Sequence, residues 1–150
     1  MSVVAWDGKT LAADKRLMQG DLGTIGSKIT KLDSGEILAW AGEAGGGLAL
    51  VHWFVSGRRK EDWPDRQKTD DWTRLIVVDK TGVYSYEHEP LPQTVLAPFV
   101  AWGSGRDCAL GAMAMGADAI VAVRVASQFI VSCGGGVEFF EIAQDKRSDS

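Results

Sequence analysis

Two kinds of hydrophobic spacing follow each other along this chain, and their order limits the possible folds more than any other feature. Short apolar or alternating runs bounded by turn residues predict β-strands, whereas apolar residues that recur about every three to four positions predict helices. The expected strands are Ser2–Trp6, Thr10–Asp14, Lys28–Leu32, Glu36–Ala41, Leu75–Asp79, Gly82–Tyr86, Pro98–Trp102 and Val137–Ile142. The expected helices are Gly45–Val55, Asp107–Met115 and Asp118–Ser132.

The order is therefore strands, one helix, strands, two helices and a final strand. This order is typical of the α+β class, in which helices cover antiparallel sheets. Asp7-Gly8 predicts a hairpin between the first two strands, and Asp33-Ser34-Gly35 predicts a second turn. The segment up to Ala41 is thus expected to form two antiparallel hairpins. Asp118 is the expected N-cap of the last helix.

The connecting segments carry weaker signals. Lys15–Gly26 contains three glycines and is expected to be a loop or an irregular strand. The charges of Arg58–Arg74 nearly cancel, which favours a solvated loop or a short ragged helix. His88–Pro98 is a connection interrupted by prolines. No linker divides the chain, so residues 1–150 are expected to form one domain, with 143–150 as a frayed C-terminal tail.

Charge and composition exclude several classes of function. The net charge of −4 argues against a general nucleic-acid binder. No run approaches the roughly 18 apolar residues of a membrane-spanning helix, and the N-terminus has no basic segment of the kind that opens a secretory signal. The two cysteines, Cys108 and Cys133, lie far apart and fit a reducing compartment. We therefore expect a cytoplasmic protein that binds neither membranes nor nucleic acid.

The common catalytic and cofactor motifs are not present. His52 lies among apolar helix residues and is expected to be a half-buried packing residue, and His88 is expected to be a solvated loop residue, so no metal site is predicted. Gly42–Gly47 and Gly103–Gly111 match neither phosphate-binding motif and predict tight turns before helices. Ser104 lies in Gly-Ser-Gly without the longer nucleophile elbow. No cofactor is expected.

The residue after the initiator methionine is a different kind of candidate. Small second residues such as Ser2 permit removal of Met1, which would place a hydroxyl and an α-amine on one residue. An α-amine titrates at about 7.7–8.0 and can accept a proton near neutral pH. A terminal Ser or Thr can use its own amine as a base. If Met1 is retained, Ser2 has no α-amine for this purpose.

Several short motifs along the chain fit this interpretation by their order and spacing. They are Ser2-Val3-Val4-Ala5-Trp6-Asp7-Gly8, Leu11-Ala12-Ala13-Asp14, Ser27-Lys28-Ile29, Ala41-Gly42, Trp102-Gly103-Ser104-Gly105 and Gly134-Gly135-Gly136-Val137-Glu138. With these motifs the chain resembles the proteasome β-subunits and HslV-type peptidases of the N-terminal nucleophile (Ntn) hydrolase superfamily. The resemblance runs from Ser2 to Ile142 and is greatest to small HslV-like proteins of bacteria and phages.

The resemblance implies a role for each of five residues. Ser2 takes the position of the nucleophilic threonine, and Asp14 matches the acid at the end of the second strand. Lys28 matches the lysine beside the nucleophile, Gly42 the glycine whose N–H contributes to the oxyanion hole, and Ser104 the serine that supports the terminal amine. In such a site Lys28 would lower the pKa of the neighbouring hydroxyl and amine, and Asp14 would hold Lys28 in place.

Three positions depart from or qualify the family pattern. Serine lacks the γ-methyl group that restricts χ1 of threonine, so the Ser2 hydroxyl would be less well oriented. Proteasome β-subunits usually carry an aspartate at the position of Ile130. HslV-type sequences are apolar at this position, as this chain is. Trp40 falls where relatives shape the substrate pocket, although packing in the core explains it better.

The resemblance implies a four-layer αββα sandwich of two antiparallel sheets between helices. It also implies a Thr/Ser-type peptidase that cleaves peptides or unfolded proteins, assembles as a homo-oligomeric ring, and depends on a separate chain for any ATP-dependent unfoldase. Two alternatives stay open: a catalytically inert structural or binding protein with the same fold, and an Ntn amidase that acts on a small amide.

Overall fold

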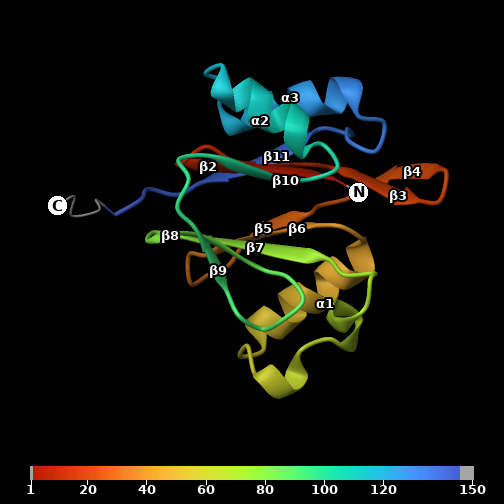
Figure 1. Ribbon diagram of the computed structural model, residues 1–150, viewed down its shortest axis with the longest axis vertical. Helices are drawn as coiled ribbons and strands as arrows, with labels where there is room; N and C mark the ends of the chain where they lie inside the picture. The colour runs from red at the N-terminus through yellow and green to blue at the C-terminus, as the bar shows by residue number, and fades with distance from the viewer. Residues whose placement is uncertain (1, 146–150) are drawn as a thin grey trace.

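Helices and sheets stack in four layers in the computed structural model, which describes residues 2–145 (Figure 1). The layers are a pair of helices, a four-stranded sheet, a five-stranded sheet and a single helix. The helices are α1 (Ala44–Val55), α2 (Arg106–Ala114) and α3 (Ala119–Phe129). The expected αββα sandwich is therefore confirmed.

Both sheets are antiparallel throughout. The first has the order β10-β1-β2-β11, formed by Val100–Gly103, Val3–Trp6, Thr10–Asp14 and Val137–Glu141. The second has the order β5-β6-β7-β8-β9, formed by Ile29–Lys31, Ile37–Ala41, Arg74–Asp79, Gly82–Tyr86 and Gln93–Val95. The two expected hairpins thus exist, one in each sheet.

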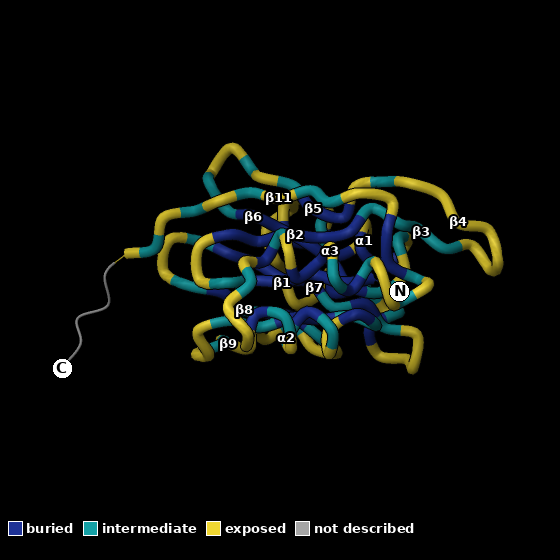
Figure 2. The backbone as a smooth tube through the Cα atoms, turned by 90° about the horizontal axis from the view of Figure 1, so that it is seen from above, coloured by how far each residue is buried: buried dark blue, intermediate teal, exposed yellow. Residues whose placement is uncertain are grey.

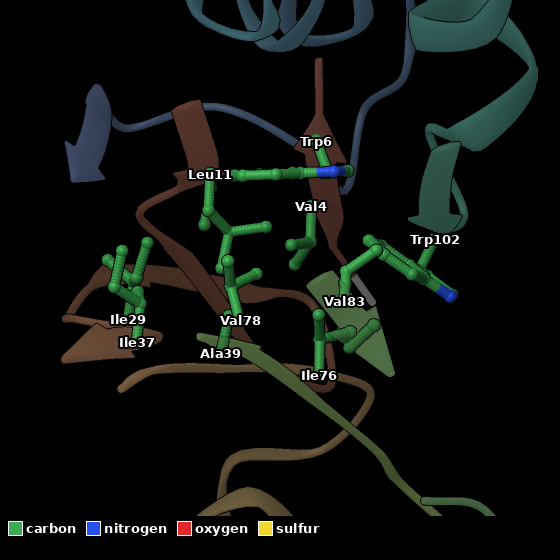
Figure 3. Packing of buried hydrophobic residues seen from close by; sticks show 12 residues of the cluster. Val4, Trp6, Leu11, Ile29, Ile37, Ala39, Ile76, Val78, Val83 and Trp102 are labelled. Atoms are coloured by element: carbon green, nitrogen blue, oxygen red, sulfur yellow. The ribbon is translucent and has the colours of Figure 1, made fainter. Parts of the chain in front are cut away.

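Alternation along the strands divides the hydrophobic residues among the spaces between layers. In β1, Val4 and Trp6 face the second sheet, whereas Val3 and Ala5 face α2 and α3. The space between the sheets is filled by the residues that Figure 3 shows, among them Leu11, Ile37, Ile76, Val78 and Trp102. A third cluster, which includes Leu38, Leu50, Trp53, Phe54, Leu75 and Tyr86, lies between the second sheet and α1. Figure 2 shows the buried backbone running through the centre of both sheets.

The turn after β1 connects the first sheet to α3. Asp7 Oδ1 accepts hydrogen bonds from the backbone N–H groups of Lys9 and Thr10, at 2.9 and 2.8 Å. Its other oxygen accepts from Ala119 N at 2.8 Å, in the first turn of α3. Asp118 accepts from Val121 N at 2.8 Å and is the N-cap of α3, as predicted.

Three segments differ from the sequence expectation. Lys15–Gly26 forms a regular antiparallel hairpin, β3 (Arg16–Gln19) and β4 (Leu22–Ile25), which projects from the first sheet (Figures 1 and 2). His88–Pro98 contributes β9 at the edge of the second sheet. The last helix ends at Phe129 rather than Ser132, because Ile130 has an extended backbone with φ −105° and ψ 114°. Apolar spacing does not reveal this end, since the apolar residues continue beyond it.

Smaller differences concern the long connection and the chain end. Arg58–Arg74 contains two short 3₁₀ turns, Lys60–Asp62 and Asp65–Lys68, consistent with the expected ragged segment. Of the expected tail, Gln144 Nε2 donates to Asp79 O at 2.8 Å and Asp145 N donates to Lys80 O at 2.7 Å. The remainder, 146–150, lies outside the described residues. Within residues 2–145 no helix is long and apolar enough to cross a membrane.

Candidate active site

Ser2 lies directly before β1, where hydrogen bonds hold both its hydroxyl and its carbonyl. The Gly42 N–H donates to Ser2 Oγ at 3.3 Å. The carbonyl oxygen of Ser2 accepts from Gly105 N at 3.2 Å and from Ser104 Oγ at 3.4 Å. Two loops that are far apart in the sequence, one after β6 and one after β10, therefore fix the position of Ser2.

Asp14, at the end of β2, connects four segments of the chain. Its Oδ1 atom accepts from Lys28 Nζ at 2.7 Å and from Val3 N at 3.1 Å. Its Oδ2 atom accepts from Gly134 N at 3.0 Å. The side chain is fully buried, so each of these bonds forms in a poorly solvated environment where a missing partner would be costly.

Lys28 is buried in the same place, just before β5. Its side chain is 1% exposed. Burial lowers the pKa of Lys28 from its ordinary value, and the Asp14 carboxylate opposes this by stabilising the ammonium form. A lysine whose charged form is destabilised gives up its proton more readily than a solvated lysine.

Two glycines make the close approaches around Ser2 possible. Gly42 has φ +136°, and a Cβ atom there would lie 2.9 Å from Thr73 Oγ1. Gly103, the last residue of β10, has φ +96°, and a Cβ atom there would lie 2.0 Å from the carbonyl oxygen of Ser2. A side chain at either position would displace the residues that hold the hydroxyl.

The loop after α3 returns to the site and brings Ser132 and Cys133 to Ser104. Ser104 Oγ lies 2.8 Å from Ser132 Oγ and 3.8 Å from Cys133 Sγ. Burial raises the pKa of the Cys133 thiol, and the charge of Asp14 raises it further. Such a thiol stays protonated at neutral pH and is a poor nucleophile.

The structure brings all five predicted site residues into one hydrogen-bonded cluster. Ser2 contacts Gly42 and Ser104 directly, and Asp14 connects Lys28 to the backbone next to Ser2. Sequence reasoning missed the contributions of Ser132 and Gly134. Gly134 belongs to the glycine motif that formed part of the resemblance, and Ser132 lies two residues before it.

A cleft of about 620 Å³ opens beside this cluster. Its walls are formed by Ser2, Ala41, Gly42, Trp72, Arg74, Gly103, Ser104 and Arg106. Sequence reasoning did not identify Trp72, Arg74 or Arg106, because they come from the charged connection, the start of β7 and the start of α2. A hollow of similar volume, about 640 Å³, lies beside α3 and includes Cys133 but neither Ser2 nor Gly42.

Neither the two histidines nor Trp40 belongs to the hydrogen-bonded cluster around Ser2, although His88 contacts Trp72 at the cleft wall. His52 is exposed rather than half-buried, because the face of α1 that packs on the sheet carries Leu50, Trp53 and Phe54. His88 is exposed in its loop, as expected, and its ring packs against that of Trp72 with the centroids 4.4 Å apart and the planes tilted by 46°. Trp40 is buried, and its indole fills the position where Gly47 of α1 would carry a Cβ atom. Residues 2–145 contain no group of three His, Cys, Asp or Glu residues that could hold a metal ion.

Solved structures share this fold, although no family model matches the chain and no curated protein matches it significantly. BPH of Thiobacillus denitrificans in complex with epoxomicin has a TM-score of 0.77 and 20% identity, over 97% of this chain and 100% of that chain. HslV from Trypanosoma brucei has a TM-score of 0.70 and 17% identity, over 95% of this chain and 99% of that chain. The predicted resemblance to HslV-type proteins is thus confirmed for the fold.

Proposed function

We propose that this protein is an N-terminal-nucleophile peptidase in which Ser2, after removal of Met1, attacks the substrate carbonyl. One observation carries the proposal. A single oxygen of Asp14 holds both Lys28 and the backbone N–H that follows Ser2, while the Ser2 hydroxyl accepts the Gly42 N–H at the wall of a cleft. A solvent-facing strand end would not require a buried ion pair at this place.

The first half of the reaction forms an ester. Ser2 Oγ bonds to the carbonyl carbon of the substrate. The proton of the hydroxyl passes to the α-amine of Ser2 or to the side-chain amine of a neutral Lys28. The lowered pKa of Lys28 increases the share of the neutral amine relative to a solvated lysine. The Gly42 N–H donates to the oxygen that becomes negative, an interaction worth a few kcal/mol in such sites, about 3–4. The C–N bond then breaks, and the leaving amine takes the proton.

The second half of the reaction releases the acyl group. Water attacks the ester carbonyl, the α-amine accepts a proton from that water, and Ser2 Oγ leaves and is protonated again. Ser104 and Gly105 donate hydrogen bonds to the carbonyl oxygen of Ser2. These bonds fix the backbone of Ser2 and thereby the orientation of its α-amine. The BPH structure was solved with epoxomicin, which supports its use as a probe for a nucleophile in this position.

We also propose that the protein works as a homo-oligomeric ring on peptides or unfolded proteins, supplied where needed by a separate ATP-dependent unfoldase. The projecting β3–β4 hairpin, which exposes Leu22 and Ile25 by 62% and 64%, supports contacts between copies. Native mass spectrometry of the untagged protein tests the assembly, and a monomer at micromolar concentration would contradict it.

Intact mass measurement combined with epoxomicin labelling tests the chemistry. We expect a mass that is short by one methionine, an epoxomicin adduct mapped to Ser2, and cleavage of an unfolded protein. Ser2→Ala, which keeps the terminal amine but lacks the hydroxyl, should abolish both labelling and cleavage. Ser56→Ala, which removes an exposed hydroxyl at the end of α1, should change neither.

The same measurements separate the alternatives. Full-length mass with no adduct at Ser2 would support an inert structural or binding protein. Labelling at Ser2 without cleavage of any peptide, but with hydrolysis of small amides, would support an Ntn amidase.

A further inference from the structure

We propose that the cleft beside Ser2 selects substrates that carry a carboxylate next to the cleaved bond, and that Arg74 and Arg106 recognise this carboxylate. The inference rests on the proposed function and adds a substrate class to it. The two guanidinium groups reach the cleft from different elements, the start of β7 and the start of α2.

Arg74 is held rigidly at the cleft wall. Its position in β7 is paired with Ala41, the residue before Gly42. Its Nη2 atom lies 2.7 Å from Glu87 Oε1, and its guanidinium lies 5.1 Å from the ring centre of Trp72. Its Nε–H is buried and has no acceptor among residues 2–145, so a ligand in the cleft would meet the terminal nitrogens of the guanidinium rather than Nε. A positioned guanidinium of this kind loses little entropy when it binds a carboxylate.

Arg106 supplies the less compensated charge. Its Nη1 atom donates to Gly103 O at 3.1 Å, which anchors the side chain next to the loop that holds Ser2. The side chain is 57% exposed, and the neighbouring carboxylate of Asp107 lies 3.9 Å away and is 91% exposed. An exposed pair at this distance neutralises little of the charge.

Within residues 2–145, the cleft wall itself carries no negative charge that would cancel these two cations. None of the eight described residues that line the cleft is an aspartate or a glutamate. The Lys28–Asp14 pair behind Ser2 is close to neutral as a unit. A chain with a net charge of −4 therefore places two cations at its cleft, where Glu87 lies 2.7 Å from Arg74 and the exposed Asp107 lies 3.9 Å from Arg106.

A carboxylate is the ligand that fits this arrangement. Guanidinium groups bind carboxylates through parallel N–H···O bonds, and the Trp72 ring offers an apolar wall for the methylene groups of a glutamate side chain. The carboxylate could belong to the side chain of the residue before the cleaved bond or to the C-terminus of a short peptide. Both sources present the same group to the two arginines.

Binding to the Ser2→Ala protein tests the selection without chemistry. Matched peptides capped at both ends and differing only in Glu or Gln at one position test side-chain recognition. A neutral peptide with a carboxylate or an amide at its C-terminus tests recognition of the chain end. We expect the carboxylate form of at least one pair to bind about tenfold more tightly at low salt, with the difference reduced at high salt.

Charge variants assign the effect to the two arginines. Arg106→Gln and the double variant Arg74→Gln/Glu87→Gln, which leaves no unpaired charge, should each reduce the preference several-fold. Glu87→Gln alone should increase the preference because it releases Arg74 from its counter-ion. Arg124→Gln removes an exposed charge on α3 and serves as the matched control. Thermal denaturation of each variant verifies that it is folded.

Several results would overturn the proposal. They are equal binding of both members of each pair, no binding of any of these peptides, and an equal loss of preference in Arg124→Gln. Equal cleavage rates by the active protein, for Glu against Gln peptides and for free against amidated C-termini, would overturn the carboxylate selection. Such a result would leave the proposed peptidase activity standing. Failure of epoxomicin to label Ser2 would overturn the peptidase, while the binding experiment would still decide the selection.

Discussion

Asp14 and Lys28 form an ion pair of 2.7 Å in which both side chains are withdrawn from solvent, at 0% and 1% exposure. The two partners are not equivalent. Asp14 also accepts hydrogen bonds from the backbone of Val3 and Gly134, so its negative charge is stabilised from three directions. Removal of the carboxylate therefore also deprives these two backbone N–H groups of their acceptor.

This asymmetry predicts unequal costs for the two single substitutions. Asp14→Asn removes the counter-charge of a buried ammonium and weakens bonds to two backbone N–H groups, so we expect a loss of about 3–5 kcal/mol in the free energy of unfolding. Lys28→Met leaves Asp14 with its two backbone donors and should cost clearly less, about 1–3 kcal/mol. Urea denaturation of both variants measures the difference. An equal cost would mean that the backbone bonds to Asp14 contribute little.

The sequence was most informative about residues that lie within or beside regular strands. Ser2, Asp14 and Lys28 each begin, end or precede a strand whose alternation is visible in the sequence, so their grouping follows once the strand order is right. The hairpin in Lys15–Gly26 was harder to predict because every residue of its second strand, β4, is exposed. An exposed strand carries little of the apolar alternation that indicates a strand in the sequence.

The remaining site residues depend on backbone geometry that no local pattern encodes. Ser132 reaches Ser104 because α3 stops at Phe129 and the chain turns back, although its apolar residues continue. Arg74 and Arg106 meet at the cleft through the packing of two sheets. Such contacts join residues far apart in the chain, and a single sequence does not display them.

Gly103 is the most sterically constrained position next to Ser2. Gly103→Ala would combine a φ of +96° with a Cβ atom 2.0 Å from the Ser2 carbonyl oxygen. We expect a loss of about 3 kcal/mol or more, from backbone strain and overpacking together, with loss of epoxomicin labelling in any folded fraction. Denaturation curves and labelling yield measure both effects.

Gly111, inside α2, is the matched control for that substitution. Nothing lies within 4 Å of a Cβ atom there. Gly111→Ala should stabilise the protein by about 0.5–1 kcal/mol because alanine favours the helix. If both alanine variants changed stability alike, the close approach at Gly103 would not be real.

Tyr84 on β8 predicts a stability change at alkaline pH. Burial raises its pKa from 10 to about 12, and the neighbouring Tyr86 contributes in the same direction. Between these two values the folded chain holds a proton that the unfolded chain has released, so stability is constant below about pH 10 and falls as the pH rises toward 12. Tyrosinate absorbance should show this late transition, and Tyr84→Phe should remove it together with that part of the stability decrease. A transition of Tyr84 at its ordinary pKa would contradict the burial seen here.

The contact between Ser104 and Ser132 predicts coupling between two substitutions. Each hydroxyl is half-buried, and the two oxygens lie 2.8 Å apart, while Ser104 also donates to the Ser2 carbonyl at 3.4 Å. Ser104→Ala and Ser132→Ala should each cost about 1 kcal/mol of stability. Because a small displacement of the reacting groups is costly, each should also lower peptide cleavage by about ten- to a hundredfold.

A double-mutant cycle distinguishes this coupling from two independent losses. The double variant should be little worse than Ser104→Ala alone, because Ser132 acts on Ser2 through Ser104. Ser127→Ala is the matched control: it also removes a half-buried hydroxyl, one that donates to Val123 O within α3 at 2.8 Å. Because alanine favours a helix and a serine bond to the i−4 carbonyl adds little to helix stability, it should change stability little and leave cleavage unchanged. If the two losses of activity simply multiplied in the double variant, Ser132 would act on the substrate by another route than Ser104.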